Sequence, residues 1–138
     1  MNRLYANVIR YFLVMLSLLL ISGVWMFIEH SSLNIITMSH YYGQKTLFGL
    51  LETLTPHLFG MGTVVFILSH FLALQNKNSK IEAQLSLGLF ILMILSNFTV
   101  FFIEETSFSI ALIKLVSTFL LLLTFFIIII KVYFRTKL

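Results

Sequence analysis

Residues Thr55 to Gln75 read TPHLFGMGTVVFILSHFLALQ, a stretch that combines a membrane-length apolar run with two histidines. Thr55 is of a type that caps helices, and Pro56 suits the first helical turn, where no backbone amide hydrogen is needed. We therefore predict a membrane helix that begins here. His57 would lie at its start and His70 well inside it, and ionisable side chains at membrane depth are candidate functional residues.

Composition defines the class of protein. The chain has 138 residues, of which 59% are hydrophobic and 10% are charged, whereas soluble domains carry about 25% charged residues. The absence of cysteine excludes disulfides, thiolate metal sites and covalent attachment of c-type haem. The net charge of +4 comes from basic residues that flank apolar runs, so we expect the lipid bilayer as partner and no nucleic acid.

Four apolar runs predict four spanning helices, at about 7–28, 56–75, 83–103 and 108–130. Each run is close to the ~20 residues that cross a hydrocarbon core. The connections at 76–79 and 104–107 are short, which makes neighbouring helices antiparallel, as in an up-down bundle. We expect one all-α integral membrane domain over residues 1–138.

The first outer loop is the longest connection, from Glu29 to Thr55. Charged and polar residues in this loop are interleaved with apolar residues at helical spacing. The apolar residues are Leu47, Leu50, Leu51 and Leu54. This pattern predicts an amphipathic interfacial helix at about Lys45–Leu54, on the outer surface of the membrane.

Three of the helices carry a stripe of polar or small residues, which we expect to face the bundle interior. The stripes are Ser22, Gly23, Met26, Glu29 and His30 on the first helix, Ser86, Met93, Asn97 and Glu104 on the third, and Lys114, Ser117, Thr118 and Thr124 on the fourth. The simplest explanation is that small and hydroxyl residues pack membrane helices together. Asn97 and Lys114 would be costly in contact with lipid and should face inward.

Lys114 admits two interpretations. Its stem can extend to the outer headgroups, where the ammonium would pair with Glu104 or Glu105. Alternatively, it anchors an anionic or polar group of a ligand, such as a haem propionate or a quinone oxygen.

Three histidines fall near the outer end of the predicted bundle: His30, His40 and His57. His30 ends the first helix and His57 begins the second, so an antiparallel pair would place both at similar depth. Two facing imidazoles can ligate the iron of haem b, with His57 and His30 as the favoured ligands and His40 in reserve. The alternatives are a non-haem metal site that adds Glu29 or Glu52, and plain interfacial polar residues.

His70 follows His57 by 13 residues, roughly 20 Å along a helix axis. This helix resembles the paired-histidine helix of the respiratory cytochrome b family, in which two histidines of one helix serve two stacked haems. The family spacing is slightly longer, and 13 residues place the two rings about 140° apart around a straight helix. The other interpretation is a buried His70 that bonds to Ser86 or to a carbonyl.

We therefore expect a small membrane b-type cytochrome, or the haem-bearing subunit of a respiratory electron-transfer assembly, with quinone as a possible second ligand. Such a protein would work with other membrane or redox subunits more than as a stand-alone enzyme. The alternatives are a cofactor-free structural or assembly subunit, and an outer-face protein that binds or transports a non-haem metal.

Orientation follows from the basic residues. Seven lie at one end of the predicted bundle, namely Arg3, Arg10, Lys77, Lys80, Lys131, Arg135 and Lys137, and Lys45 lies at the other. We predict that both termini are cytoplasmic, in a bacterial inner membrane, because basic flanks stay inside. Reporter fusions at the C-terminus should be active only in the cytoplasm; an externally active C-terminal reporter would reverse the topology.

Overall fold

The computed structural model describes residues 3–31, 33–75, 80–104 and 108–135, and within them the chain is helical with no strands. The elements are α1 (Arg3–Ser31), α2 (Ile35–Gly43), α3 (Leu47–Gln75), α4 (Lys80–Phe98), the 3₁₀ helix η1 (Thr99–Phe102) and α5 (Phe108–Arg135). Four of these segments are long and apolar enough to cross a membrane, α4 together with η1 being one of them. The all-α membrane class is confirmed. The predicted turn at 76–79, and residues 105–107 of the next turn, lie outside the described residues.

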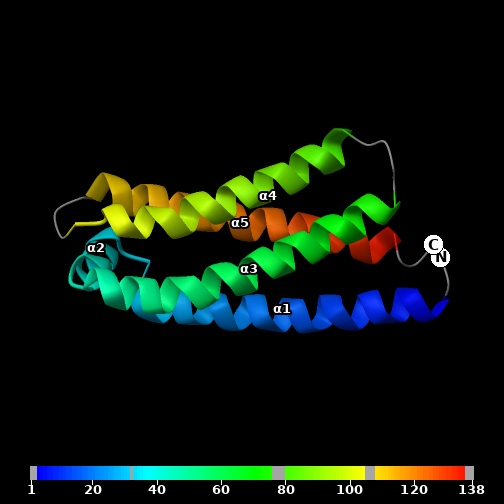
Figure 1. Cartoon of the computed structure of the whole chain (residues 1–138), viewed down its shortest axis with the longest axis horizontal. Coiled ribbons are helices and arrows are strands. Elements are labelled where there is room, and N and C mark those ends of the chain that lie inside the picture. Colours follow the sequence, from blue (N-terminus) through cyan, green and yellow to red (C-terminus); the bar gives the residue numbers. More distant parts are fainter. Residues whose placement is uncertain (1–2, 32, 76–79, 105–107, 136–138) are drawn as a thin grey trace.

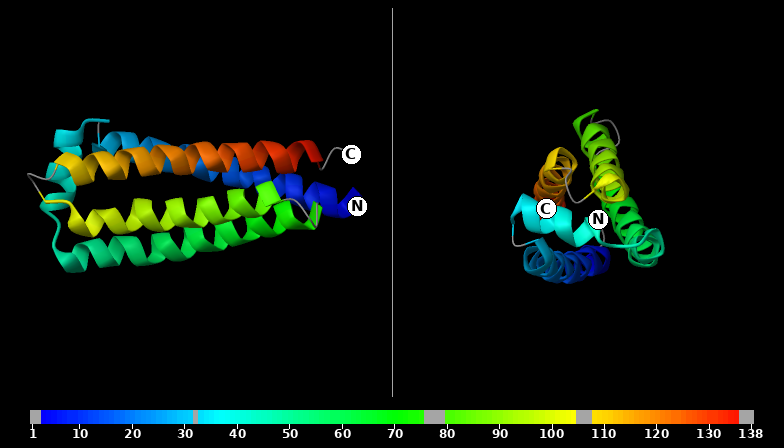
Figure 2. Two further views of the ribbon diagram at one scale, coloured as in Figure 1. Left: turned by 90° about the horizontal axis from the view of Figure 1, so that it is seen from above. Right: turned by 90° about the vertical axis from the view of Figure 1, so that its left-hand side faces the viewer.

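The long helices lie side by side and alternate in direction (Figures 1 and 2). The start of α1 and the end of α5 lie together at one end, here named the terminal end. The short helix α2 lies at the opposite end, here named the α2 end, where α4 also gives way to α5. This is the predicted up-down bundle with a short helix in its first loop.

The apolar core lies between α1, α3, α4 and α5, and each helix contributes residues at helical spacing. Its buried members include Ile9, Leu13, Leu16 and Leu20 of α1, Val65, Leu68 and Leu72 of α3, Leu89 and Met93 of α4, and Leu121, Phe125 and Ile128 of α5. An edge-to-face contact between Phe12 and Phe71, with ring centroids 5.5 Å apart, joins α1 to α3. On α5, this apolar stripe follows the buried polar residues Lys114 and Ser117, which lie nearer the α2 end.

The predicted inward polar stripe of α1 is wrong. Ser22, Gly23, Met26, Glu29 and His30 are all exposed. The buried stripe from Ile9 to Leu20 continues through the half-buried Val24 and Phe27. At about 100° per residue, the polar residues lie mostly on the opposite side of the helix, so burial of the apolar stripe turns them outward.

The predicted boundary between a surface helix and a spanning helix is also wrong, because Lys45–Leu54 is not a separate element. Helix α3 begins at Leu47, and Thr46 caps it: the Gly49 amide donates to Thr46 Oγ1 at 3.2 Å. Pro56 lies inside α3, not at its start. Membrane helices tolerate an internal proline. The Thr55 hydroxyl beside it donates to the Leu51 carbonyl at 2.8 Å, one position before the Glu52 carbonyl that lacks an amide partner from Pro56.

The helix of the first loop is α2 instead. Asn34 caps it by accepting a bond from the Ile36 amide at 3.0 Å. Met38 and Ser39 are buried, and α2 lies against both α1 and α5. This short helix therefore covers the α2 end of the bundle (Figure 2).

An ion pair joins α4 to α5 at the terminal end. Arg135 Nη1 donates to Glu82 Oε1, from the last turn of α5 to the first turn of α4. The Glu82 side chain is 5% exposed and that of Arg135 is 34% exposed. Burial of the carboxylate makes the guanidinium its essential partner, while the exposure of Arg135 reduces the strength of the pair.

We predict that Glu82→Gln and Arg135→Gln each lower the free energy of unfolding by about 1–3 kcal/mol, the cost of leaving a buried group without its charged partner. The double variant should lose less than the sum of the two, because both changes break one interaction. Reversible unfolding in mixed micelles measures this. Lys131→Gln, one turn earlier on α5, is the matched control, and additive effects of the two variants would rule out the coupling.

Candidate functional site

Lys114 is the most informative polar residue of the structure. It is 7% exposed, and its Nζ donates to the Ser96 carbonyl of the neighbouring helix α4. Asn97 is 3% exposed. The inward orientation predicted for both residues is confirmed, and the interpretation of Lys114 as an extended side chain at the headgroups is wrong.

The position of Ser96 near the end of α4 explains why its carbonyl accepts a hydrogen bond from Lys114. The last carbonyls of a helix lack intrahelical partners and carry the negative end of its dipole. Helix α4 ends at Phe98 and tightens into η1, and the Thr99 hydroxyl also donates to the Ser96 carbonyl, at 3.2 Å. The ammonium of Lys114 therefore lies at the carbonyl end of α4.

Two other elements, α3 and α2, reach the same point. Asn97 Nδ2 donates to its own helix at the Met93 carbonyl, at 2.8 Å, and contacts Met61 Sδ of α3 at 3.8 Å. From α2, the Tyr42 ring centroid lies 6.0 Å from Lys114 Nζ. We name Tyr42, Met61, Ser96, Asn97 and Lys114 the α2-end cluster.

Tyr42 is the member of this cluster that lies outside the spanning segments. Burial, reinforced by the neighbouring Tyr41, raises the pKa of the Tyr42 phenol to about 12. Because the neutral phenol is favoured in the folded state, Tyr42 gives its full contribution to stability below pH 10. That contribution falls as the pH rises from 10 through 12. The cluster thus holds a neutral phenol at physiological pH.

His30 lies at the same end, on the outside of α1. Its Nδ1 is 2.7 Å from the Met26 carbonyl. A carbonyl can only accept, so Nδ1 carries the hydrogen of this bond, and in the neutral ring Nε2 keeps its lone pair. The ring packs edge-on against Tyr41 at 5.0 Å between centroids, and Lys45 Nζ donates to the Tyr41 hydroxyl at 2.9 Å.

The remaining histidines are exposed and apart from the core. His40 is within 3.4 Å of Gln44 Nε2, and His57 and His70 lie on exposed faces of α3. The alternative prediction, that His70 is buried and bonds to Ser86 or to a carbonyl, is therefore wrong. In the described part of the chain, no three His, Asp or Glu side chains gather as a metal site would require. The site built from His30, His40 and His57 with Glu29 or Glu52 is not formed.

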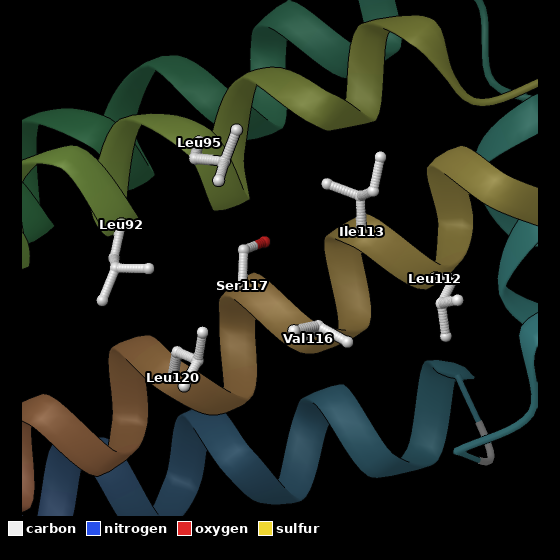
Figure 3. Close-up of a pocket in the computed structure, with 7 residues that line it drawn as sticks. All are labelled: Leu92, Leu95, Leu112, Ile113, Val116, Ser117 and Leu120. Atoms are coloured by element: carbon white, nitrogen blue, oxygen red, sulfur yellow. The ribbon is translucent and has the colours of Figure 1, made fainter.

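An open groove lies between α4 and α5 (Figure 3). Its volume is about 220 Å³, and its lining residues are Leu92, Leu95, Leu112, Ile113, Val116, Ser117 and Leu120. Pockets for drug-sized ligands are about 300–1,000 Å³, so this groove suits a chain or a small ring, not a porphyrin.

Sequence reasoning missed the partners of the charged groups. Tyr42 lies in the first outer loop, for which the sequence predicted no helix at this position. The Ser96 carbonyl belongs to the backbone, so no residue type in the sequence indicates its role. The pairing of Glu82 with Arg135 had a usable signal. Antiparallel neighbours bring the start of one helix beside the end of the next, and these residues hold those two positions.

The structure defines an integral membrane protein built from four apolar helices with a buried lysine near one end. A family model described as a transmembrane helical domain matches residues 39–137. The chain belongs to this family, Aq_1264_TM, whose matched region runs from α2 to α5 and leaves α1 out. No curated protein and no solved structure matches the chain.

Proposed function

We propose that this protein is a subunit of a larger membrane assembly, which covers the outer faces of α1 and α3. One observation carries the proposal: ionisable side chains in the spanning segments of these two helices are exposed on the outside of the bundle. They are Glu29 and His30 at the end of α1, and His70 within α3.

The physical argument is the cost of ionisable groups in lipid. Such residues in spanning helices almost always face protein or water. His70 follows Pro56 by about 21 Å along α3, so it lies well inside the span and away from the α2 end. A partner helix that donates to or accepts from its imidazole removes this cost, and small residues such as Gly23 permit close approach.

Orientation belongs to the same proposal. By the positive-inside rule we assign the terminal end, where the basic residues gather, to the cytoplasm, and the α2 end with Lys114 to the opposite side of a bacterial inner membrane. The protein then presents His30, His40 and Tyr41 to an outer-face partner.

Photo-crosslinking in native membranes tests the assembly. We expect benzoylphenylalanine at Ser22 or His70 to give protein adducts, because both positions would be covered by a partner. At Phe119, 62% exposed on α5, the same probe should give lipid adducts only, which makes it the matched control. Lipid adducts alone at all three positions would overturn the proposal, and an adduct of twice the chain mass would identify the partner as a second copy.

A haem-bearing electron-transfer subunit is the second candidate, and the His30 geometry favours it. A histidine ligand typically donates its other ring hydrogen to a carbonyl, as His30 Nδ1 does to Met26. The exposed His57 offers the second imidazole. Because these rings lie on outer faces, haem b would be enclosed only in the assembly, where it would supply one-electron chemistry.

A visible spectrum of protein made with ample haem tests this candidate. We expect a Soret band that His57→Ala abolishes and His30→Ala weakens or shifts, because each change removes one axial ligand. His70→Ala is the control and should leave the band nearly intact. A spectrum without a Soret band, or one that survives His57→Ala, contradicts haem binding at this site while leaving the assembly proposal intact.

A further inference from the structure

The exposed side of α3 is a narrow stripe over the second half of the helix. Between Phe59 and Ala73, exposed residues recur at alternating intervals of four and three, and the residues between them are buried or half-buried, apart from Gly60. The stripe, here named the α3 seam, consists of Phe59, Thr63, Phe66, His70 and Ala73. This seven-residue repeat is the pattern by which two helices wrap around each other.

His70 is the polar residue of the α3 seam that benefits from a neighbouring molecule. It is exposed and lies within the spanning segment Leu47–Ala73. Lipid offers no partner to the N–H and the lone pair of an imidazole, which makes this position costly in an isolated bundle. Thr63 differs, because its hydroxyl donates to the Phe59 carbonyl of its own helix at 2.9 Å.

Membrane topology determines how a second copy can meet the α3 seam. Flanking basic residues give every copy of the chain the same orientation in the bilayer. Two copies that pack through α3 are therefore parallel and related by a two-fold axis along the membrane normal. In such a self-complementary interface each seam residue meets its own equivalent at the same depth. His70 then lies opposite His70 of the second copy.

The hydrogen-bonding chemistry of the seam is complementary to itself. A neutral imidazole has one donor and one acceptor, so one His70 ring can donate to the other. A residue of fixed charge would face its own charge across a two-fold axis, and the sequence from His57 to Gln75 contains no Asp, Glu, Lys or Arg. An unrelated helix would need a matching polar group at this depth, whereas a second copy always brings one. The seam therefore favours a second copy as its partner.

Large and small residues alternate along the seam in a way that suits close packing. Phe59 is 79% exposed and Phe66 is 66% exposed, and aromatic rings supply much of the contact area of an interface. Small residues let helix backbones approach, and a Cβ atom added at Gly60 would meet nothing within 4 Å. Both views of Figure 2 show α3 along one margin of the bundle, where a second bundle can reach it.

We propose that α3 is a dimerisation helix, and that two copies of the chain pack in parallel through the α3 seam with a hydrogen bond between their His70 side chains. In this dimer the second copy is the partner that covers α3, so the inference rests on the proposed assembly and makes it more specific.

Cysteine crosslinking in native membranes tests the dimer. The chain has no cysteine, so a single introduced cysteine can form a disulfide only with another molecule. Oxidation with copper phenanthroline should link Thr63→Cys and Phe66→Cys into a species of twice the chain mass. Phe119→Cys, 62% exposed on α5, is the matched control and should stay monomeric. Monomer at both seam positions, or an equal yield of dimer at Phe119→Cys, overturns the proposal.

Energy transfer between labelled full-length chains in mixed micelles tests the role of His70. We expect His70→Leu to weaken self-association by about threefold to tenfold, because it keeps an apolar side chain but loses the hydrogen bond between helices. His70→Asn should retain most of the affinity, since an amide also has a donor and an acceptor. Equal affinity in wild type and His70→Leu overturns the hydrogen-bonded pair.

The outcome for the dimer is separable from the outcome for the assembly. Photo-adducts of the Ser22 and His70 probes with other proteins, together with monomeric Thr63→Cys and Phe66→Cys, overturn the dimer and leave the assembly proposal intact. Lipid adducts alone together with monomeric seam variants overturn both.

Discussion

The hydrocarbon core offers no hydrogen-bond partners, and this constraint governs where every polar group of the bundle lies. Most hydroxyls find a hydrogen-bond partner within their own helix, by donating to a carbonyl one turn earlier. This holds for Ser17, Thr53, Thr55, Thr63, Thr118 and Thr124. A hydroxyl satisfied in this way needs no neighbour, so its position around the helix says little about which face is buried.

Charged groups cannot be satisfied locally, and they make the polar links between helices. Lys114 reaches the Ser96 carbonyl at the α2 end, and Arg135 reaches Glu82 at the terminal end. These links fix α4 and α5 at both ends of their contact. Helix α1 is held differently, by apolar contacts such as that between Phe12 and Phe71. The family model, which begins at residue 39, matches the part of the chain that contains both charged links.

This difference explains which features the sequence predicts. Length and hydropathy determine the number of spans, because each helix must cross the same hydrocarbon thickness. The inward direction of Asn97 and Lys114 is predictable, since neither has an inexpensive place in lipid. The outward orientation of the polar stripe of α1 is not predictable from that stripe. The apolar residues from Ile9 to Leu20 on the other side of the helix are the ones buried in the core, and they decide how α1 is oriented. The start of α3 was predicted wrongly from Pro56, because a proline fits both the first turn of a helix and the interior of a membrane helix.

The two charged links differ in how well they compensate their charges, and this difference distinguishes the two ends of the bundle. At the terminal end, a full positive charge meets a full negative charge on the partly exposed Arg135. At the α2 end, the partner that the described residues give to the Lys114 ammonium is the Ser96 carbonyl, which carries the partial charge of a helix terminus. Within the described residues, a full countercharge is therefore present for the link at the terminal end, and a helix-terminus carbonyl for the link at the α2 end.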